Sequence, residues 1–247
     1  MLHHFAKFMA VTSLAAIITI PISQITAQTS QKFNVPSKPR VMSLGDSLCA
    51  NNMATLRKMV TEKGISVDWV GTKKDGPKPD PHNECHGGWS AAQVLGVAPL
   101  PSWERSNSPI LKDWLSKTKP DIILLMLGTN DYFQKTAPQL PETMTKILDN
   151  IYDNNPKAVV VISTITPFGW NKTGSSQRKY NQFIREETAR RKSQNQSIIF
   201  VDMYKAVGFD GLGKDNLHLN KIGNERMAIQ WLDALNIILN NRANRSR

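Results

Sequence analysis

The chain has 247 residues, 40% of them apolar, which is enough to bury one sizeable core and indicates a single domain. Lys and Arg number 31 against 20 Asp and Glu, giving a formal net charge of +11 at pH 7. The basic residues are scattered, apart from a basic tail at 242–247, and no helix-turn-helix, zinc-finger or RNA-binding pattern is present, so we expect no nucleic-acid partner.

The first 27 residues have the pattern of a secretory signal peptide. Lys7 supplies the positive start, residues 8–20 are apolar, and residues 25–27 (Ile-Thr-Ala) form a small-residue cleavage site. The apolar run is shorter than the roughly 20 residues of a spanning helix, so we expect no stable membrane insertion after cleavage. The predicted parts of the chain are a signal peptide at 1–27, an N-terminal extension at 28–38, one folded domain at 39–241 and the basic tail at 242–247. The protein is therefore predicted to be secreted or periplasmic.

After the signal peptide, short β-rich runs alternate with helical stretches. Strands are predicted at 40–44, 65–70, 121–127, 158–164 and 197–203. Helices are predicted at 54–63, 109–116, 142–154, 176–192 and 221–239. The third and fourth strands contain runs that are apolar on both faces, as a parallel sheet covered by helices on each side requires. This rhythm predicts an α/β fold with three layers (α/β/α) and a doubly wound, parallel, five-stranded sheet of flavodoxin-like type.

The last predicted helix has apolar residues separated by seven, three, three and four positions, which is the spacing of one helical face. Those residues are Ile222, Ile229, Leu232, Leu235 and Leu239. We expect this face to pack on the core.

The segment at 71–100 breaks the alternation and is too polar for a core, and loops of this length are usually functional. Within it, side chains of metal-ligand type gather at Asp80, His82, Glu84, Cys85 and His86. Their spacing matches none of the zinc patterns, so we predict no metal site and no cofactor.

The chain has two cysteines, Cys49 and Cys85. In an oxidising compartment they can form a disulfide, which would stabilise the fold by about 3–4 kcal/mol and join two loops of interest below. The alternative is a pair of unrelated buried thiols.

Polar side chains follow three of the predicted strands. Ser47 lies on a Gly-Asp-Ser turn after the first strand, Asn130 follows the third, and Asp215 and His218 follow the fifth. Sites in open α/β sheets form beyond the carboxyl ends of the strands, so these groups should meet at one edge. Taken singly, each has a simpler interpretation: Asp46 braces the turn, Asn130 caps a helix, and His218 lies on the surface.

Together these segments resemble the GDSL/SGNH hydrolase family. The matching blocks are 45–48 (Gly-Asp-Ser-Leu), 128–131 (Gly-Thr-Asn-Asp) and the Asp-x-x-His of 215–218. The segment 83–89 (Asn-Glu-Cys-His-Gly-Gly-Trp) is similar to a block of the family's carbohydrate-esterase branch, notably acetylxylan esterases, with Cys85 in place of the usual glycine. The four blocks occur in the family's order across the mature chain.

The resemblance implies a role for each matched residue. Ser47 would be the nucleophile, His218 its general base, and Asp215 the carboxylate that orients the imidazole. The oxyanion hole would consist of the N–H of Ser47, the N–H of Gly88 and the side-chain amide of Asn130, with Gly87 as the alternative glycine. Two loop tryptophans, Trp89 and Trp170, are candidates for stacking on a sugar, although packing beneath the loops is the commoner use of such residues.

We therefore predict a secreted serine esterase that removes acetyl or other short acyl groups, on a carbohydrate, through an acyl-Ser47 intermediate. The expected partner is an acylated carbohydrate or another small ester, and we expect a monomer. Two alternatives stay open. One is a lysophospholipase, thioesterase or short-chain lipase of the same family, and the other is a non-catalytic glycan-binding module.

Overall fold

A computed structural model describes residues 31–169 and 174–243 of the chain. The predicted signal peptide, Trp170 and the last four residues of the predicted tail lie outside these residues. The described residues belong to one compact unit that begins at Gln31.

The centre of this unit is a parallel sheet with the strand order β2-β1-β4-β5-β6. The strands are β1 (Arg40–Gly45), β2 (Asp68–Val70), β4 (Ile122–Met126), β5 (Val159–Ser163) and β6 (Ile198–Val201). Every residue of β4 and β5 is buried, as the two-sided apolar runs require. The predicted fold class is confirmed, and a two-residue strand, β3 (Glu84–Cys85), is added beside the end of β1.

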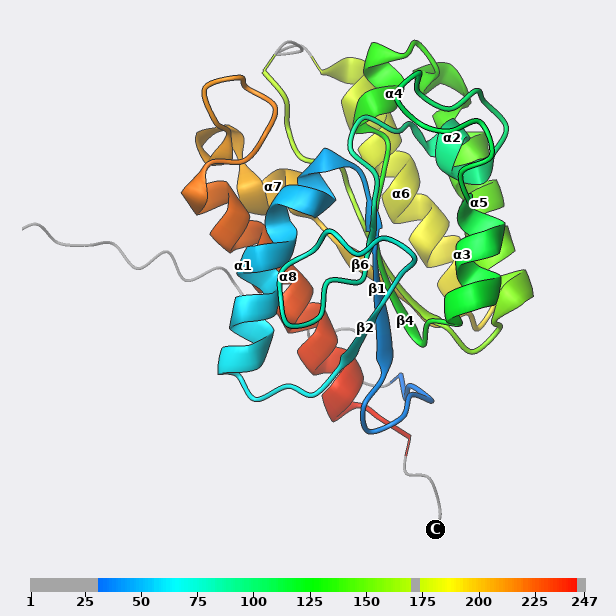
Figure 1. Cartoon of the computed structure of the whole chain (residues 1–247), viewed down its shortest axis with the longest axis vertical. Helices are drawn as coiled ribbons and strands as arrows, with labels where there is room; N and C mark the ends of the chain where they lie inside the picture. The colour runs from blue at the N-terminus through cyan, green and yellow to red at the C-terminus, as the bar shows by residue number, and fades with distance from the viewer. Residues whose placement is uncertain (1–30, 170–173, 244–247) are drawn as a thin grey trace, which may run out of the picture. The chain divides into compact units, whose positions relative to one another are not determined.

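Helices cover both faces of the sheet (Figure 1). One side carries α1 (Ser47–Glu62), α7 (Met203–Val207) and α8 (Lys221–Asn240). The other carries α2 (Ala91–Leu95), α3 (Leu111–Thr118), α4 (Thr129–Phe133), α5 (Leu140–Asn154) and α6 (Ser175–Ser193). Short 3₁₀ turns lie at Ala137–Gln139 and Phe209–Gly211. A search of the described helices finds none with the length and apolar character needed to cross a membrane.

The first helix begins earlier than the sequence indicates. It was predicted at 54–63 but starts at Ser47, because the Asp46 carboxylate caps it by accepting a hydrogen bond from the N–H of Leu48 at 2.9 Å. Ser47 is therefore the first residue of the helix, where a backbone N–H has no partner within the helix.

The last helix presents a different apolar face from the predicted one. Leu232 and Leu235 are buried as expected, but Ile222 and Ile229 are 50% and 43% exposed. The side of α8 that carries Asn224 faces α1. The carbonyl of Asn224 accepts a hydrogen bond from the side chain of Asn52 at 2.8 Å. The buried face consists of Gly223, Met227, Ala228, Trp231, Leu232, Ala234, Leu235 and Ile238.

Residues outside the predicted 39–241 boundaries take part in the compact unit. Phe33 and Val35, from the predicted N-terminal extension, are buried in the core. The N–H of Phe33 donates to the carbonyl of Asn241, and the N–H of Ala243 donates to the carbonyl of Phe33, each at 2.9 Å. These hydrogen bonds join the two ends of the described chain.

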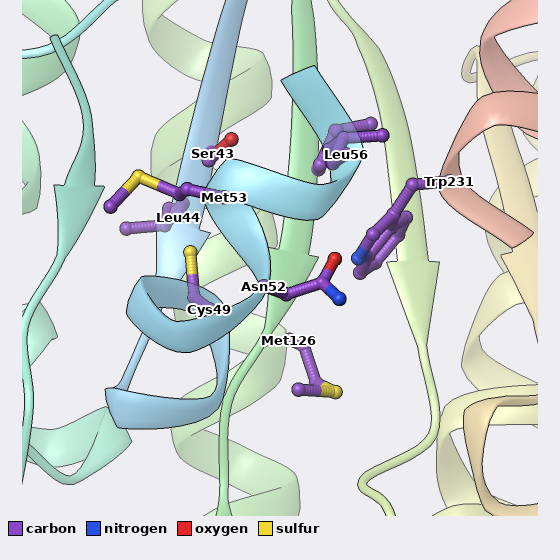
Figure 2. Close-up of a pocket in the computed structure, with 9 residues that line it drawn as sticks. Ser43, Leu44, Cys49, Asn52, Met53, Leu56, Met126 and Trp231 are labelled. Atoms are coloured by element: carbon purple, nitrogen blue, oxygen red, sulfur yellow. The ribbon is translucent and has the colours of Figure 1, made fainter. Parts of the chain in front are cut away.

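A small cavity lies behind the start of α1, between β1, β4 and α8 (Figure 2). Its volume is about 10 Å³, which is space for one water molecule and far too small for a substrate. Its lining consists of Ser43, Leu44, Cys49, Asn52, Met53, Leu56, Leu124, Met126 and Trp231. The close packing here fixes the helix that carries Ser47 against the sheet.

Candidate active site

Three of the predicted site residues meet at the carboxyl edge of the sheet. Ser47 comes from the start of α1, and Asp215 and His218 come from the loop that precedes α8. His218 Nε2 lies 3.0 Å from Ser47 Oγ, and His218 Nδ1 lies 2.7 Å from Asp215 Oδ2. The hydroxyl, imidazole and carboxylate are thus joined in series by two hydrogen bonds.

The Asp215 side chain makes hydrogen bonds within its own loop, and these stabilise the loop. The second oxygen, Oδ1, accepts hydrogen bonds from the N–H groups of Leu217 at 3.1 Å and His218 at 3.0 Å. The side-chain hydrogen bond to His218, followed by the one from Leu217, lowers the pKa of Asp215 below its ordinary range. The carboxylate is therefore ionised at neutral pH, and it can accept a hydrogen bond from the N–H at Nδ1 of His218.

Asn130 reaches the site from the second residue of α4. Gly128, with φ +126°, lets the chain turn sharply from β4 into this helix. The Asn130 amide donates to the carbonyl of Trp89 at 3.0 Å and, at a longer 3.4 Å, to Oδ2 of Asp46. The amide thus joins the loop at residues 86–89 to the turn that carries the serine.

The two candidate glycines lie in a tight turn between His86 and Trp89, closed by the Trp89 N–H donating to the His86 carbonyl at 3.1 Å. Gly88 has φ +81°, the value required at the third position of a type II turn. The turn leaves the N–H of Gly88 without an internal acceptor, because that group belongs to the central peptide. A β-carbon built on Gly87 would lie 3.8 Å from Cβ of Ser47, so the turn and the serine are adjacent.

Several bonds fix this turn beside the serine. The N–H of His86 donates to the carbonyl of Gly45 at 2.8 Å, and the Gln134 side chain donates to the carbonyl of Gly88 at 2.8 Å. The predicted disulfide between Cys49 and Cys85 is present, with its Cα atoms 5.4 Å apart, and it ties the first turns of α1 to β3. The two loops named in the sequence are therefore cross-linked next to the hydroxyl.

A buried, hydrogen-bonded glutamate–histidine pair beneath the turn was missed as such from the sequence. His86 Nε2 lies 2.9 Å from Oε2 of Glu84, whose other oxygen accepts from the N–H of Thr72, and Glu84 has no exposed surface. The His86 ring contacts both Trp89 and Trp114, with 4.4 Å between ring centroids in each pair. The alternation Glu-x-His on a short strand was the available signal, because such residues share a face.

This packing contradicts the role predicted for Trp89. Its side chain is 1% exposed, because it covers His86 and contacts the Trp114 ring at 6.0 Å, so it cannot stack on a substrate in an open cleft. Trp170, the other predicted stacking residue, lies outside the described residues.

The residues of metal-ligand type at 80–86 are divided among separate contacts. Asp80 pairs with His82, Glu84 pairs with His86, and Cys85 is in the disulfide. Within residues 31–169 and 174–243, no three His, Cys, Asp or Glu side chains are grouped to hold a metal ion.

Burial affects the carboxyl group that caps α1. Asp46 is 1% exposed, and desolvation raises its pKa to about 7, although the hydrogen bond from Leu48 and the nearby His218 act in the opposite direction. Its folded-state pKa thus lies above the ordinary value of 3.8, so the folded protein binds an extra proton between these pH values and loses stability as the pH rises through them.

We expect Asp46→Asn to remove this pH-dependent cost. The free energy of unfolding of the variant, relative to that of the wild type, should increase by a few kcal/mol between pH 4 and pH 8. The slope of this increase should be at most about 1.4 kcal/mol per pH unit, the value for one proton. Urea unfolding of both proteins at several pH values measures this difference. A difference that stays constant with pH would contradict a raised pKa for this carboxyl.

A parallel sheet that presents a serine, a histidine and an aspartate in series at its carboxyl edge is an arrangement typical of hydrolases. Residues 43–226 match the GDSL-like lipase/acylhydrolase family, so the chain belongs to that family. The resemblance stated from the sequence is thereby confirmed.

Relatives and solved structures agree with this assignment. A multidomain esterase of Ruminococcus flavefaciens is 29% identical over 237 residues, which cover 81% of this chain and 30% of that protein. An acetyl esterase mutant solved with acetate ion is 26% identical with a TM-score of 0.69, over 82% of this chain and 99% of that one. A family 3 carbohydrate esterase of Talaromyces cellulolyticus has the same identity and TM-score, over 83% and 100%. The chain spans less than a third of the Ruminococcus protein.

Proposed function

We propose that the protein is an exported serine esterase that removes acetyl or another short acyl group from a carbohydrate. The observation that carries the proposal is the pair of distances in the site, 3.0 Å from His218 Nε2 to Ser47 Oγ and 2.7 Å from Nδ1 to Asp215. A serine hydroxyl is a weak nucleophile at neutral pH unless a base removes its proton during attack.

In the first half-reaction, Ser47 Oγ attacks the ester carbonyl and its proton passes to Nε2 of His218. Asp215 accepts the hydrogen bond from Nδ1, which selects the tautomer with a free Nε2 and stabilises the imidazolium that forms. The imidazolium then donates its proton to the leaving sugar oxygen, and the acyl group stays on Ser47. In the second half-reaction, water gives a proton to Nε2 of His218 and attacks the acyl-serine. The imidazolium then returns this proton to Ser47 Oγ as the bond from Oγ to the acyl carbon breaks, which releases the carboxylic acid and restores the free enzyme.

The negative charge on the tetrahedral intermediate needs donors that are already in position. We assign this role to the N–H of Ser47, the N–H of Gly88 and the side-chain amide of Asn130. The first of these groups begins a helix, the second belongs to the central peptide of a type II turn, and the third donates to the carbonyl of Trp89. Because all three belong to elements that are hydrogen-bonded to one another, little reorganisation is needed during the reaction.

The substrate class and the site of action rest on three supports. The solved structures named above are an acetyl esterase and a carbohydrate esterase, and the segment at 83–89 resembles the carbohydrate-esterase branch. The Cys49–Cys85 disulfide suits an oxidising compartment outside the cytosol.

The experiment is a deacetylation screen on acetylated xylan, pectin, peptidoglycan and sialic acid, together with p-nitrophenyl esters of increasing acyl length. We expect acetate release from at least one glycan, and a kcat/KM that falls as the acyl chain grows. Activity that rises beyond butyryl would favour a lysophospholipase, thioesterase or lipase. Glycan binding without hydrolysis of any ester would favour a binding module.

A further inference from the structure

One aromatic side chain lies beside the turn at residues 86–89 and has no role in the proposed mechanism. Trp103 is 70% exposed, the highest value among the large apolar side chains of the described residues. It lies in the connection between α2 and α3, at the third position of a turn closed by the Glu104 N–H donating to the Pro101 carbonyl at 2.8 Å. Pro101 is buried, so the turn is anchored while the indole projects into solvent.

The indole ring is held over Gly88. A β-carbon built on Gly88 would lie 2.9 Å from Cζ2 of Trp103 and 3.4 Å from Cη2. Any larger residue at this position would push the ring away, in addition to straining a backbone with φ +81°. The ring is therefore in van der Waals range of the glycine we assign to the oxyanion hole.

This contact places the ring at the rim of the active site. Gly87 is adjacent to Ser47, and Gly88 is adjacent to Trp103, so two successive residues separate the nucleophile from the indole. An ester bound with its carbonyl at Ser47 and Gly88 would extend its remaining atoms past this ring. The other groups at the site are polar: the Asn130 amide donates to the carbonyl of Trp89, and His218 is hydrogen-bonded to Asp215 and Ser47.

We propose that Trp103 is a specificity-determining residue, whose exposed indole binds the sugar ring that bears the ester. The C–H face of a pyranose is apolar, and stacking it on an indole removes apolar surface of both partners from water while the sugar hydroxyls stay hydrated. This inference rests on the proposed function and adds to it the recognition of a cyclic sugar. Stacking acts on binding, so it should favour esters on sugar rings over esters of small acyclic alcohols.

The test compares Trp103→Ala and Trp103→Phe with the wild type on two substrates, glucose pentaacetate and ethyl acetate, which has no ring. We expect Trp103→Ala to lower kcat/KM on glucose pentaacetate about tenfold, chiefly by raising KM, and to change ethyl acetate hydrolysis less than twofold. Trp103→Phe should retain most of the activity on the sugar. Val97→Ala, at a 67% exposed apolar residue of the same connection, is the matched control and should behave as the wild type.

Two results would overturn the inference while the proposed function stands. One is an unchanged kcat/KM of Trp103→Ala on glucose pentaacetate. The other is an equal loss of kcat/KM on both substrates, which would mean that the indole only supports the turn at residues 86–89. Wild-type protein that hydrolyses ethyl acetate but no acetylated sugar would overturn the proposed function and this inference together.

Discussion

Replacement of Ser47 by alanine is expected to reduce kcat for p-nitrophenyl acetate by at least about 10⁴-fold. The hydroxyl is the atom that His218 Nε2 reaches at 3.0 Å, and alanine offers neither a nucleophile nor a proton for that base. Any remaining activity would come from water held beside the oxyanion donors. Steady-state kinetics on the purified variant, with mass spectrometry of the wild type after an organophosphorus inhibitor, measures the effect and locates the modified residue.

The fold should be unaffected, because the hydrogen bond from Ser47 to His218 is an active-site contact and the helix is capped by Asp46. Ser43→Ala is a matched control, since Ser43 is a buried serine on β1 whose hydroxyl has no hydrogen-bond partner among the described residues. It should keep wild-type kcat. Esterase activity of Ser47→Ala near the wild-type level, with the inhibitor on another residue, would disprove the assignment.

The sheet and the convergence of the site could be predicted because their signals are local. The two-sided apolar runs of β4 and β5 require a covered parallel sheet, and such a sheet brings the residues after its strands to one edge. Ser47, Asn130 and His218 each follow a strand in the chain. Their meeting therefore follows from topology, without knowledge of a single side-chain contact.

The early start of α1 was not predicted, because the local cap by Asp46 is accompanied by contacts that are distant in sequence. Serine and asparagine are modest helix formers, so the segment 47–53 reads as an extension of the turn. In the structure Leu48, Asn52 and Met53 of this segment are buried, and Asn52 donates to the carbonyl of Asn224 on α8, 172 residues away. Tertiary packing, and not intrinsic propensity, makes these residues helical.

The aromatic residues show a second limit. Trp89 lies in the polar segment at 71–100 and Trp103 lies just after it, and composition does not indicate which of them is covered. The buried Glu84–His86 pair is covered by Trp89 and Trp114, which both contact the imidazole ring and also contact each other. Trp103 is left exposed at the surface beside Gly88.

Asp215→Asn is expected to lower kcat about 10³-fold at neutral pH. The asparagine amide can present a donor where Nδ1–H now donates, which favours the wrong imidazole tautomer, and it carries no charge to stabilise the imidazolium. The Asp215 side chain is 51% exposed, so water screens part of its charge, and we expect a smaller loss than the roughly 10⁴-fold effect of a buried triad aspartate. KM should change little, because the effect arises in the transition state.

The pH profile separates this role from a structural one. The pKa of Asp215 is lowered by its hydrogen bond with His218, so the carboxylate is ionised from pH 4.5 to 8.5. In Asp215→Asn the negative charge that stabilises the imidazolium in the transition state is absent throughout this range, so the loss of kcat should persist across it. Measurements of kcat from pH 4.5 to 8.5 on both proteins test this expectation. Asp210→Asn is the matched control. Asp210 is an exposed aspartate in the same connection between α7 and α8, where it pairs with Arg226 of α8, and its replacement should leave both kcat and its pH profile unchanged. If Asp215→Asn kept kcat within about threefold of the wild type, His218 would have to be oriented by the rest of its loop, and the triad would reduce to a Ser47–His218 dyad.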